Sequence, residues 1–375
     1  MAKPDYTALG LMSGTSMDGI DVALLTTDGH RRVKPGAWMT VPYRDDLRSR
    51  LARLVAAPDT ADPHTLIEMS AAITDAHAEA VQGFLARHFL DARRIDLVGF
   101  HGHTISHRPD LGITRQIGDG ARLAAALGID VVDDFRSADV AAGGQGAPLA
   151  PLYHAALAAY LPRPLAVLNI GGVANVTLID GETLLAFDTG PGNGLVDDWV
   201  ARHTGLPYDA DGRLAASGQV AEAALERLLD NPYFALDPPK SLDRHSFSPA
   251  AADGLSPADG AATLTVFTAE TVARALDHLP ARPRRWLVTG GGRHNRFLMA
   301  LLRARLGVPV EPVESVGWQG DALEAQAFAY LAVRSLRGLP LSLPGTTGTP
   351  LPTRGGVLHR KPEQPAPAAA RQVQA

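Results

Sequence analysis

The chain has 375 residues, of which 46% are hydrophobic and 20% charged, a balance typical of soluble globular proteins. This length exceeds one ordinary core, so we expect two domains. The net charge of −5 argues against a nucleic-acid partner, and the absence of cysteine excludes disulfides and thiolate chemistry. The sequence shows neither a signal peptide nor an apolar stretch that could span a membrane, so a cytoplasmic protein is expected.

The first predicted elements are two paired strands over residues 6–12 and 20–27. The loop between them combines glycine, hydroxyl and acidic residues, among them Ser13, Gly14, Thr15, Ser16 and Asp18. Consecutive N–H groups in a glycine turn can bind an anion, and an acid suits such a loop mainly when Mg²⁺ lies between it and the phosphates. A β-hairpin with a polar tip explains the same residues equally well.

Helices and strands are expected in turn between residues 45 and 148. The helices cover 45–55, 66–84 and 121–127, and the strands cover 95–100 and 129–132. Polar residues follow each strand, at the carboxyl end where ligands sit in open α/β sheets. They are His101, His103 and Thr104 in a loop after the first strand, and Arg136 and the stretch 141–148 after the second. A metal site at the two histidines is not expected, because no third ligand is evident.

The second half of the chain begins like the first. Strands over 165–170 and 173–179 flank the turn Gly171-Gly172, and a third strand over 184–187 runs into Asp188. A glycine-turned hairpin near residue 14 therefore recurs near residue 171. This internal repeat predicts two similar lobes that face one cleft.

The remaining pattern is mainly helical. Helices are predicted over 195–203, 215–229, 264–279 and 321–337, the last with Glu324, and a strand over 286–289 precedes a further helix that ends at residue 306. That strand is followed by Gly290, Gly291 and Gly292, whereas a tight turn usually needs one glycine. Close approach of a ligand to the backbone is one reason for such a run. Residues 361–375 are rich in Pro, Ala and Gln, which predicts a disordered tail.

Glycine-marked turns thus follow strands near residues 14, 171, 191 and 291. The sequence contains no P-loop, no dinucleotide fingerprint and no nucleophile elbow. Two hairpins and a glycine-rich turn resemble the way in which the actin–hexokinase superfamily holds ATP. This resemblance implies an α/β fold with two similar lobes of ribonuclease H-like type around an ATP and sugar cleft.

Residues 10–21, which read Gly-Leu-Met-Ser-Gly-Thr-Ser-Met-Asp-Gly-Ile-Asp, resemble the N-terminal signature of the anhydro-N-acetylmuramic acid kinase family. Other segments resemble later motifs of that family, in the family's order, so that the resemblance covers about residues 7–358. These segments are 101–104, 116–119, 134–136, 141–149, 168–172, 187–193, 239–241 and 321–325. The chain departs from the family at two positions. His103 stands where glutamine is usual, a change that could alter a contact with the sugar. Thr189 stands where cysteine is common, a change that is expected to affect packing.

The resemblance implies an ATP-dependent kinase of cell-wall recycling and amino-sugar catabolism. It would convert 1,6-anhydro-N-acetylmuramic acid, ATP and water into N-acetylmuramic acid 6-phosphate and ADP. Because the anhydrosugar has no free 6-hydroxyl, water attacks the anomeric carbon while O6 leaves and takes the γ-phosphoryl group. By match to the family motif, Asp188 is the base for this water, and Glu324 is expected to hold it. A homodimer is also implied.

The implied ATP site joins the first loop, the second hairpin and the three-glycine turn. It comprises Gly14, Thr15, Ser16, Met17, Asp18, Gly19, Ile20, Asp21, Gly171, Gly172, Asn175, Gly290, Gly291, Gly292 and Asn295. Mg²⁺ would bind at Asp18, through water. The implied sugar site comprises His101, Thr104, Arg136, Gln145, Gly190 and Asn193, with Arg136 suited to the lactyl carboxylate. The expected N-terminal lobe covers 1–135 and about 340–360, and the C-terminal lobe covers 136–339.

Two other functions remain open on the sequence. The first is an ordinary sugar kinase of the same superfamily that phosphorylates a hydroxyl, with Asp188 as a conventional base. The second is an ATP-switched binding protein of the actin type, which has no small substrate. The transfer of label from water into the sugar, and sugar-dependent release of ADP, distinguish these functions.

Overall fold

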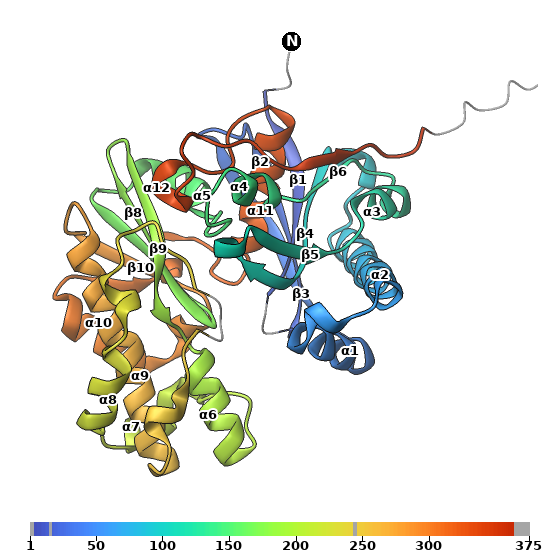
Figure 1. Cartoon of the computed structure of the whole chain (residues 1–375). Coiled ribbons are helices and arrows are strands. Elements are labelled where there is room, and N and C mark those ends of the chain that lie inside the picture. Colours follow the sequence, from blue (N-terminus) through green and yellow to red (C-terminus); the bar gives the residue numbers. More distant parts are fainter. Residues whose placement is uncertain (1–3, 15–16, 243–245, 364–375) are drawn as a thin grey trace, which may run out of the picture.

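The computed structural model describes residues 4–14, 17–242 and 246–363. Thr15, Ser16 and most of the predicted tail lie outside these ranges. Two β-sheets with helices packed on them occupy separate halves of the molecule (Figure 1). The predicted α/β class with two lobes is therefore confirmed.

The first sheet has the strand order β12-β6-β4-β1-β2-β3, and β5 pairs with β4. Its strands are β1 (Tyr6–Ser13), β2 (Gly19–Thr27), β3 (Val33–Pro42), β4 (Leu97–Arg108), β5 (Ile113–Ile117), β6 (Val131–Asp133) and β12 (Val357–His359). The β1–β2 and β2–β3 pairs are antiparallel, whereas β1–β4 and β4–β6 are parallel. The sequence pattern did not predict β3 and β5.

The second sheet repeats this arrangement with the order β11-β10-β7-β8-β9. Its strands are β7 (Leu165–Ile170), β8 (Val173–Asp180), β9 (Thr183–Pro191), β10 (Arg285–Thr289) and β11 (Val310–Pro312). The β7–β8 and β8–β9 pairs are antiparallel, and β10 is parallel to both β7 and β11. Each lobe thus contains the same five-strand order and the same strand directions, which confirms the predicted internal repeat.

Helices α1 (Asp45–Ala56), α2 (Pro63–Arg87) and α3 (Gly120–Leu127) accompany one face of the first sheet, and α11 (Leu323–Leu336) packs on the other. Side chains of β1 alternate between the two, since Leu9 and Leu11 join the α2 core whereas Ala8 joins the α11 core. A Cβ on Gly10 would overlap the backbone of Ala325, so the bare glycine lets α11 lie directly on β1. This contact places the start of α11, with Glu324, near the end of β1.

The second half carries the remaining helices. They are α4 (Ser137–Ala141), α5 (Pro151–Leu157), α6 (Gly194–Thr204), α7 (Arg213–Ser217), α8 (Glu222–Leu229), α9 (Pro257–Arg274), α10 (Arg296–Leu306) and α12 (Pro344–Thr347). The prediction of one helix over 215–229 is wrong, because α7 and α8 are separated at Gly218. There the chain passes against the backbone of Ala258 in α9, where a Cβ would overlap. A tertiary contact therefore overrides the helical periodicity.

Strand β4 continues through the predicted loop at 101–104 and ends at Arg108, so the loop prediction is wrong. Gly102 has a φ of 71°, and the pairing of β4 with β1 shifts register just before it. As a result His101 and His103 face opposite sides of the sheet: the His101 ring contacts Phe328 of α11, and His103 contacts Ser13 on the α2 side.

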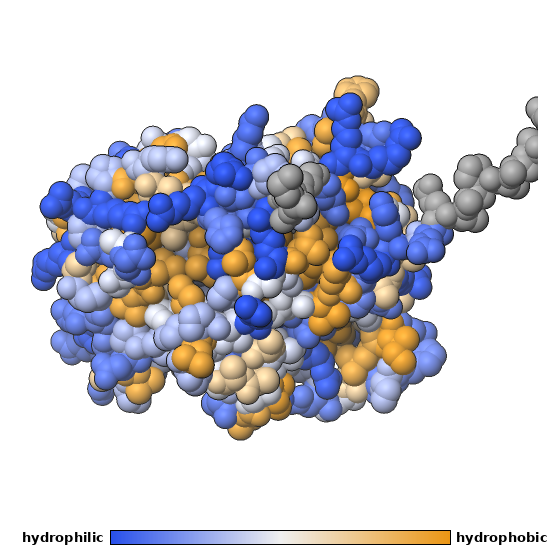
Figure 2. Space-filling view, turned by 90° about the horizontal axis from the view of Figure 1, so that it is seen from above, coloured by the Kyte–Doolittle hydropathy of each residue, from blue (hydrophilic) through white to orange (hydrophobic). Residues whose placement is uncertain are grey.

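No helix in the described ranges is long and apolar enough to cross a membrane. Hydrophilic and hydrophobic residues are interspersed on the face seen from above (Figure 2). The most exposed aromatic side chains, Phe89 at 96% and Tyr160 at 97%, belong to different parts of the chain. Such scattered exposure is ordinary for a protein surface.

Candidate active site

A row of polar side chains crosses the second sheet. Asn169 of β7, Asn175 of β8 and Asp188 of β9 lie opposite one another in register, so their side chains share one face. Asn169 Nδ2 donates to Glu324 Oε1 at 3.2 Å, which joins the row to the start of α11. We call Asn169, Asn175, Asp188 and Glu324 the polar row. It brings together the two carboxylates that the sequence singled out.

Asp188 is a buried carboxylate, 6% exposed, whose pKa is raised by burial to about 7. The N–H of Leu242 donates to Oδ2 at 2.7 Å, and this bond and the charge of Arg136 oppose the effect of burial on the pKa. Within the described ranges no hydrogen bond reaches Oδ1. A carboxylate that titrates near neutral pH with one oxygen available is suited to remove a proton from water.

Glu324 lies in the first turn of α11 and keeps exposed surface, although protein surrounds the carboxylate closely enough to desolvate it. Desolvation raises its pKa, and both Arg136 and the Asn169 amide lower it. Its position in the first turn also favours the negative charge through the helix dipole.

Arg136 links the polar row to the residues predicted to bind sugar. Its Nε donates to His101 Nε2 at 3.0 Å and its Nη1 donates to the Gly146 carbonyl at 2.7 Å. Because Nε2 of His101 accepts, Nδ1–H must donate to the Gly102 carbonyl 3.0 Å away, and the ring is neutral. Burial, followed by the charge of Arg136, holds the pKa of His101 well below its usual range.

Burial lowers the pKa of Arg136 to about 10, so the guanidinium stays charged at neutral pH, and Glu324, Asp139 and Asp188 all stabilise that charge. The arrangement therefore presents a cation whose charge interacts with both carboxylates of the polar row. A guanidinium in this position can bind the carboxylate of a ligand through two parallel hydrogen bonds.

The other predicted sugar residues divide into two groups. Gln145 lies beside Gly146 and its Oε1 accepts from Ser241 Oγ at 2.8 Å. Thr104 lies in β4, the strand that also contains His101, and its Oγ1 accepts a hydrogen bond from Gln116 Nε2 at 3.2 Å. The remaining two, Gly190 and Asn193, lie elsewhere and are described next.

Gly190 packs against Thr271 of α9. Asn193 lies at the second hairpin: its N–H donates to the Gly171 carbonyl at 2.7 Å, and its Nδ2 donates to the Ile170 carbonyl at 3.3 Å. The structure therefore sets Asn193 beside the turn that was predicted to hold phosphate.

The first hairpin loop is held at both ends by Tyr43, a residue that the sequence did not single out. Its N–H donates to the Asp18 carbonyl at 3.4 Å, and its hydroxyl donates to Ser13 Oγ at 2.7 Å. Ser13 in turn contacts Nδ1 of the fully buried His103 at 2.9 Å. His103 thus lies behind the loop, where its contact is to Ser13.

Acidic residues gather beside this loop. The pKa of Asp21 is raised to about 7 by burial, opposed by the Thr40 hydroxyl, and raised further by the charges of Glu324, Asp18 and Asp321. A divalent cation would offset this negative charge, and carboxylate oxygens are the donors that Mg²⁺ prefers. No group of three metal-binding side chains is preformed among the residues that the structure describes.

The three-glycine turn is explained in part by packing. A Cβ on Gly290 or on Gly292 would press on Ile170 of β7, whereas Gly291 has only Asn193 Nδ2 at 3.5 Å. Gly291 is therefore the position whose missing side chain suits a ligand. Asn295 caps α10, since its Oδ1 accepts from the Leu298 N–H at 2.9 Å.

Arg293 anchors this turn and was also missed on the sequence. It is 8% exposed, and its Nη1 donates to the Gly290 carbonyl at 2.9 Å. Ion pairs of 2.9 Å with Glu314 and 2.7 Å with Asp321 balance its charge. Only its place directly after the glycines hinted at this role.

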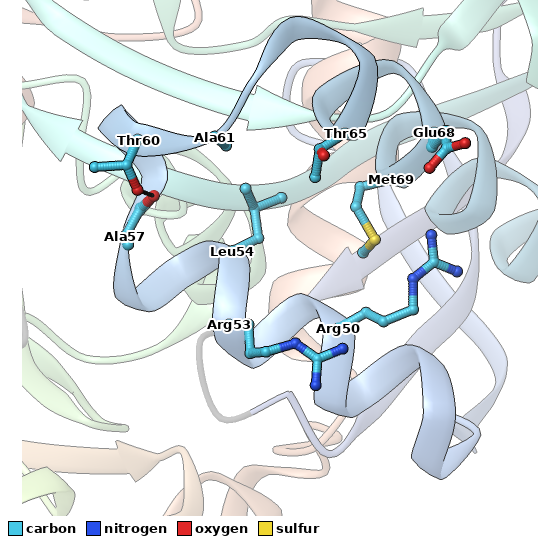
Figure 3. Close-up of a pocket in the computed structure, with 9 residues that line it drawn as sticks. All are labelled: Arg50, Arg53, Leu54, Ala57, Thr60, Ala61, Thr65, Glu68 and Met69. Atoms are coloured by element: carbon cyan, nitrogen blue, oxygen red, sulfur yellow. Dashed lines mark hydrogen bonds between the residues drawn. The ribbon is translucent and has the colours of Figure 1, made fainter.

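A hollow of about 350 Å³ lies between α1 and α2 (Figure 3). It is lined by Arg50, Arg53, Leu54, Ala57, Thr60, Ala61, Thr65, Glu68 and Met69. None of the predicted site residues lines it, so the chemistry is assigned to the polar row and the two hairpins.

Two lobes of one topology, with a glycine hairpin in each, define an α/β protein of the actin–hexokinase class. The chain belongs to the anhydro-N-acetylmuramic acid kinase family, whose family model matches residues 6–361. Both the class and the family were predicted from the motifs.

Two relatives carry the name anhydro-N-acetylmuramic acid kinase. The one from Rhizorhabdus wittichii is 56% identical over 360 residues, which cover 94% of this chain and 98% of that protein. The one from Acidiphilium cryptum is 58% identical over 369 residues, which cover 96% and 99%. Among solved structures, component A of the (R)-2-hydroxyglutaryl-CoA dehydratase from Acidaminococcus fermentans has a TM-score of 0.48 at 13% identity, with 88% of this chain and 99% of that chain covered.

Proposed function

We propose that this kinase opens 1,6-anhydro-N-acetylmuramic acid with water and phosphorylates O6 with ATP, giving N-acetylmuramic acid 6-phosphate and ADP. The step would serve peptidoglycan recycling and amino-sugar catabolism in the cytoplasm. Family membership over nearly the whole chain supports the substrate. The observation that carries the mechanism is Asp188, a buried base with a pKa of about 7 beside a cation.

In the proposed reaction, a bond forms between the water oxygen and the anomeric carbon while the bond from that carbon to O6 breaks. O6 takes the γ-phosphoryl group, and the proton of the water goes to Asp188. The phosphoryl group thus does what the acid of an inverting glycosidase does for its leaving oxygen. A positioned base of this kind contributes about 10²–10⁴-fold to the rate. Glu324 would orient the same water from α11.

Arg136 would bind the lactyl carboxylate, with neutral His101 and the Gly146 carbonyl holding the guanidinium in place. Thr104, Gln145, Gly190 and Asn193 would contact the sugar. Of these, Gln145 is closest to the Arg136 loop, and Asn193 is adjacent to the second hairpin, where sugar O6 and the γ-phosphate would meet.

The two hairpins and the turn at Gly291 would hold ATP. Asp18 and Asp21 would hold Mg²⁺ through water, and the ion would neutralise the phosphates during transfer. The gathered carboxylates that raise the pKa of Asp21 support this assignment. The family resemblance further suggests a homodimer, which analytical sedimentation tests. It also suggests that residues 1–135 together with about 340–360 form the N-terminal lobe, and that residues 136–339 form the C-terminal lobe.

Turnover in ¹⁸O-labelled water tests the mechanism. We expect label at C1 of the product and none in the phosphate. A product without label at C1 would favour the ordinary sugar kinase, which phosphorylates a hydroxyl. Release of ADP at the same rate with and without sugar would favour the actin-type switch.

A further inference from the structure

Lys240 is a buried lysine in a chain that uses few of them. Of the 35 basic residues only Lys3, Lys34, Lys240 and Lys361 are lysines. Lys240 is 7% exposed, and its Nζ donates to the carbonyls of Leu236, Tyr233 and Phe234 at 2.7, 3.1 and 3.4 Å. The side chain therefore neither points at the sugar nor lies in solvent.

The ammonium group caps the end of a short 3₁₀ turn over Pro232–Ala235. Exposed carbonyls at the end of a helical turn carry partial negative charge that a cation stabilises. An ammonium has three compact, diverging donors, whereas the guanidinium of arginine is planar and larger. Three converging carbonyls therefore suit lysine, and the contact closes residues 233–240 into a loop.

That closed loop holds Asp188 through three of its atoms. Tyr233 Oη donates to the Asp188 carbonyl at 2.6 Å, and the Asp188 N–H donates to the Lys240 carbonyl at 2.9 Å. The Leu242 N–H, two residues beyond Lys240, donates to Asp188 Oδ2 at 2.7 Å. The loop thereby fixes the backbone of Asp188 and binds Oδ2, and none of these three bonds uses Oδ1.

We propose that Lys240 is a positioning residue for Asp188, which it holds in its reactive orientation by closing the loop 233–242. The proposal rests on the proposed role of Asp188 as the base. Without the ammonium group the loop loosens and the bond from Leu242 to Oδ2 weakens. Since that bond and Arg136 are what lower the pKa of Asp188 against burial, the pKa rises further and less base is present at pH 7.

Lys240→Met tests this, with Lys34→Met on the exposed side of β3 as the matched control. We expect kcat to fall about 10- to 100-fold, as for a displaced catalytic group, with KM for ATP within about twofold of wild type. The acid limb of the kcat–pH profile is expected to move to higher pH. A Lys240→Met enzyme with wild-type kcat and acid limb overturns the proposal, even if its thermal midpoint is lower.

The absence of cysteine allows a rescue experiment. In Lys240→Cys the thiol is unique, so alkylation with 2-bromoethylamine restores an ammonium group at that site alone. We expect the alkylated enzyme to regain kcat and the acid limb, and fully alkylated folded enzyme that regains neither contradicts the proposal.

Tyr233→Phe covers the case in which the Lys240 variants do not fold. It removes only the bond to the Asp188 carbonyl, and we expect a smaller fall in kcat with the same shift of the acid limb; wild-type values of both would then count against the loop. Asp188→Asn separates the two proposals. If it retains turnover, the base assignment fails; if it is inactive while Lys240→Met matches wild type, only the role of Lys240 fails.

Discussion

The two lobes share one topology, and each places a carboxylate with a pKa of about 7 near its hairpin, but for different reasons. Asp21 of the first lobe is desolvated and also faces the charges of Glu324, Asp18 and Asp321. Asp188 of the second lobe is desolvated, while Arg136 and a backbone N–H act in the opposite direction. The excess negative charge around Asp21 favours the binding of a cation. The burial of Asp188 favours the protonated form of its carboxyl group.

The difference arises from what covers the third strand of each lobe. Residues of β3 are half-buried or exposed, so this strand of the first lobe keeps contact with solvent. The second half of β9 is buried, and the segment 233–242 hydrogen-bonds to Asp188 there. Under the proposed function the first lobe is the ion-handling lobe and the second is the base-holding lobe, and the third strands of the two lobes differ in burial.

The largest expected effect is that of Asp188→Asn on kcat. Without a base the rate should fall about 10²–10⁴-fold, with ATP affinity within about twofold of wild type. Steady-state kinetics and nucleotide titration measure both, and Asp230→Asn on the surface is the control. Near-normal turnover would show that Asp188 is not the base, and the proposed difference in role between the two lobes would then be wrong.

The same variant has a stability consequence. The folded pKa of Asp188 lies above its ordinary value, so the ionised form destabilises the fold, and stability is lost as pH rises from about 4 to about 7. Asp188→Asn should therefore melt at a higher temperature than wild type at pH 8, with the difference shrinking toward pH 4. Thermal unfolding at these pH values checks the sign.

Asp21→Asn comes next and addresses the ion-handling lobe. Loss of one carboxylate that supports hydrated Mg²⁺ should raise KM for MgATP about 10- to 100-fold. The acid limb of kcat, which reports Asp188, should stay where it is, and Asp110→Asn on the surface is the control. A shift of that limb together with an unchanged KM would reverse the assignment of the two carboxylates.

Arg136→Met addresses the link between lobes. We expect KM for the anhydrosugar to rise about 10-fold from the lost carboxylate contact, with KM for ATP nearly unchanged. Because the charge of Arg136 lowers the pKa of Asp188 and of Glu324, the acid limb should also move to higher pH. Arg282→Met is the exposed control; an acid limb that does not move would mean that Arg136 acts on the sugar alone.

The smallest effect is expected for Tyr43→Phe. It removes the hydroxyl that holds Ser13, a bond of about 1 kcal/mol, so KM for ATP should rise about fivefold. Tyr160→Phe, at a ring that is 97% exposed, is the control. An equal effect of both substitutions would show that the hydrogen bond from Tyr43 to Ser13 does not contribute to ATP binding.

Local signals explain why much of the fold was predictable. Short apolar strands at β1, β2, β7 and β8, with glycines at the turns between them, predicted both hairpins and hence the repeat. The same reasoning missed β3, whose residues show no clean alternation because neither face is fully buried. It also joined α7 and α8, since only the contact of Gly218 with α9 separates them.

By itself the sequence determined the class of fold and the family, because ordered motifs and turn residues are local properties of the chain, and it singled out the carboxylates proposed to carry the chemistry. Only the tertiary structure decided how those carboxylates differ. The partners that set their charge lie far away along the chain, as Leu242 does from Asp188 and Glu324 from Asn169. Burial and neighbouring charge control a pKa, and both come from segments that meet only when the two lobes have folded.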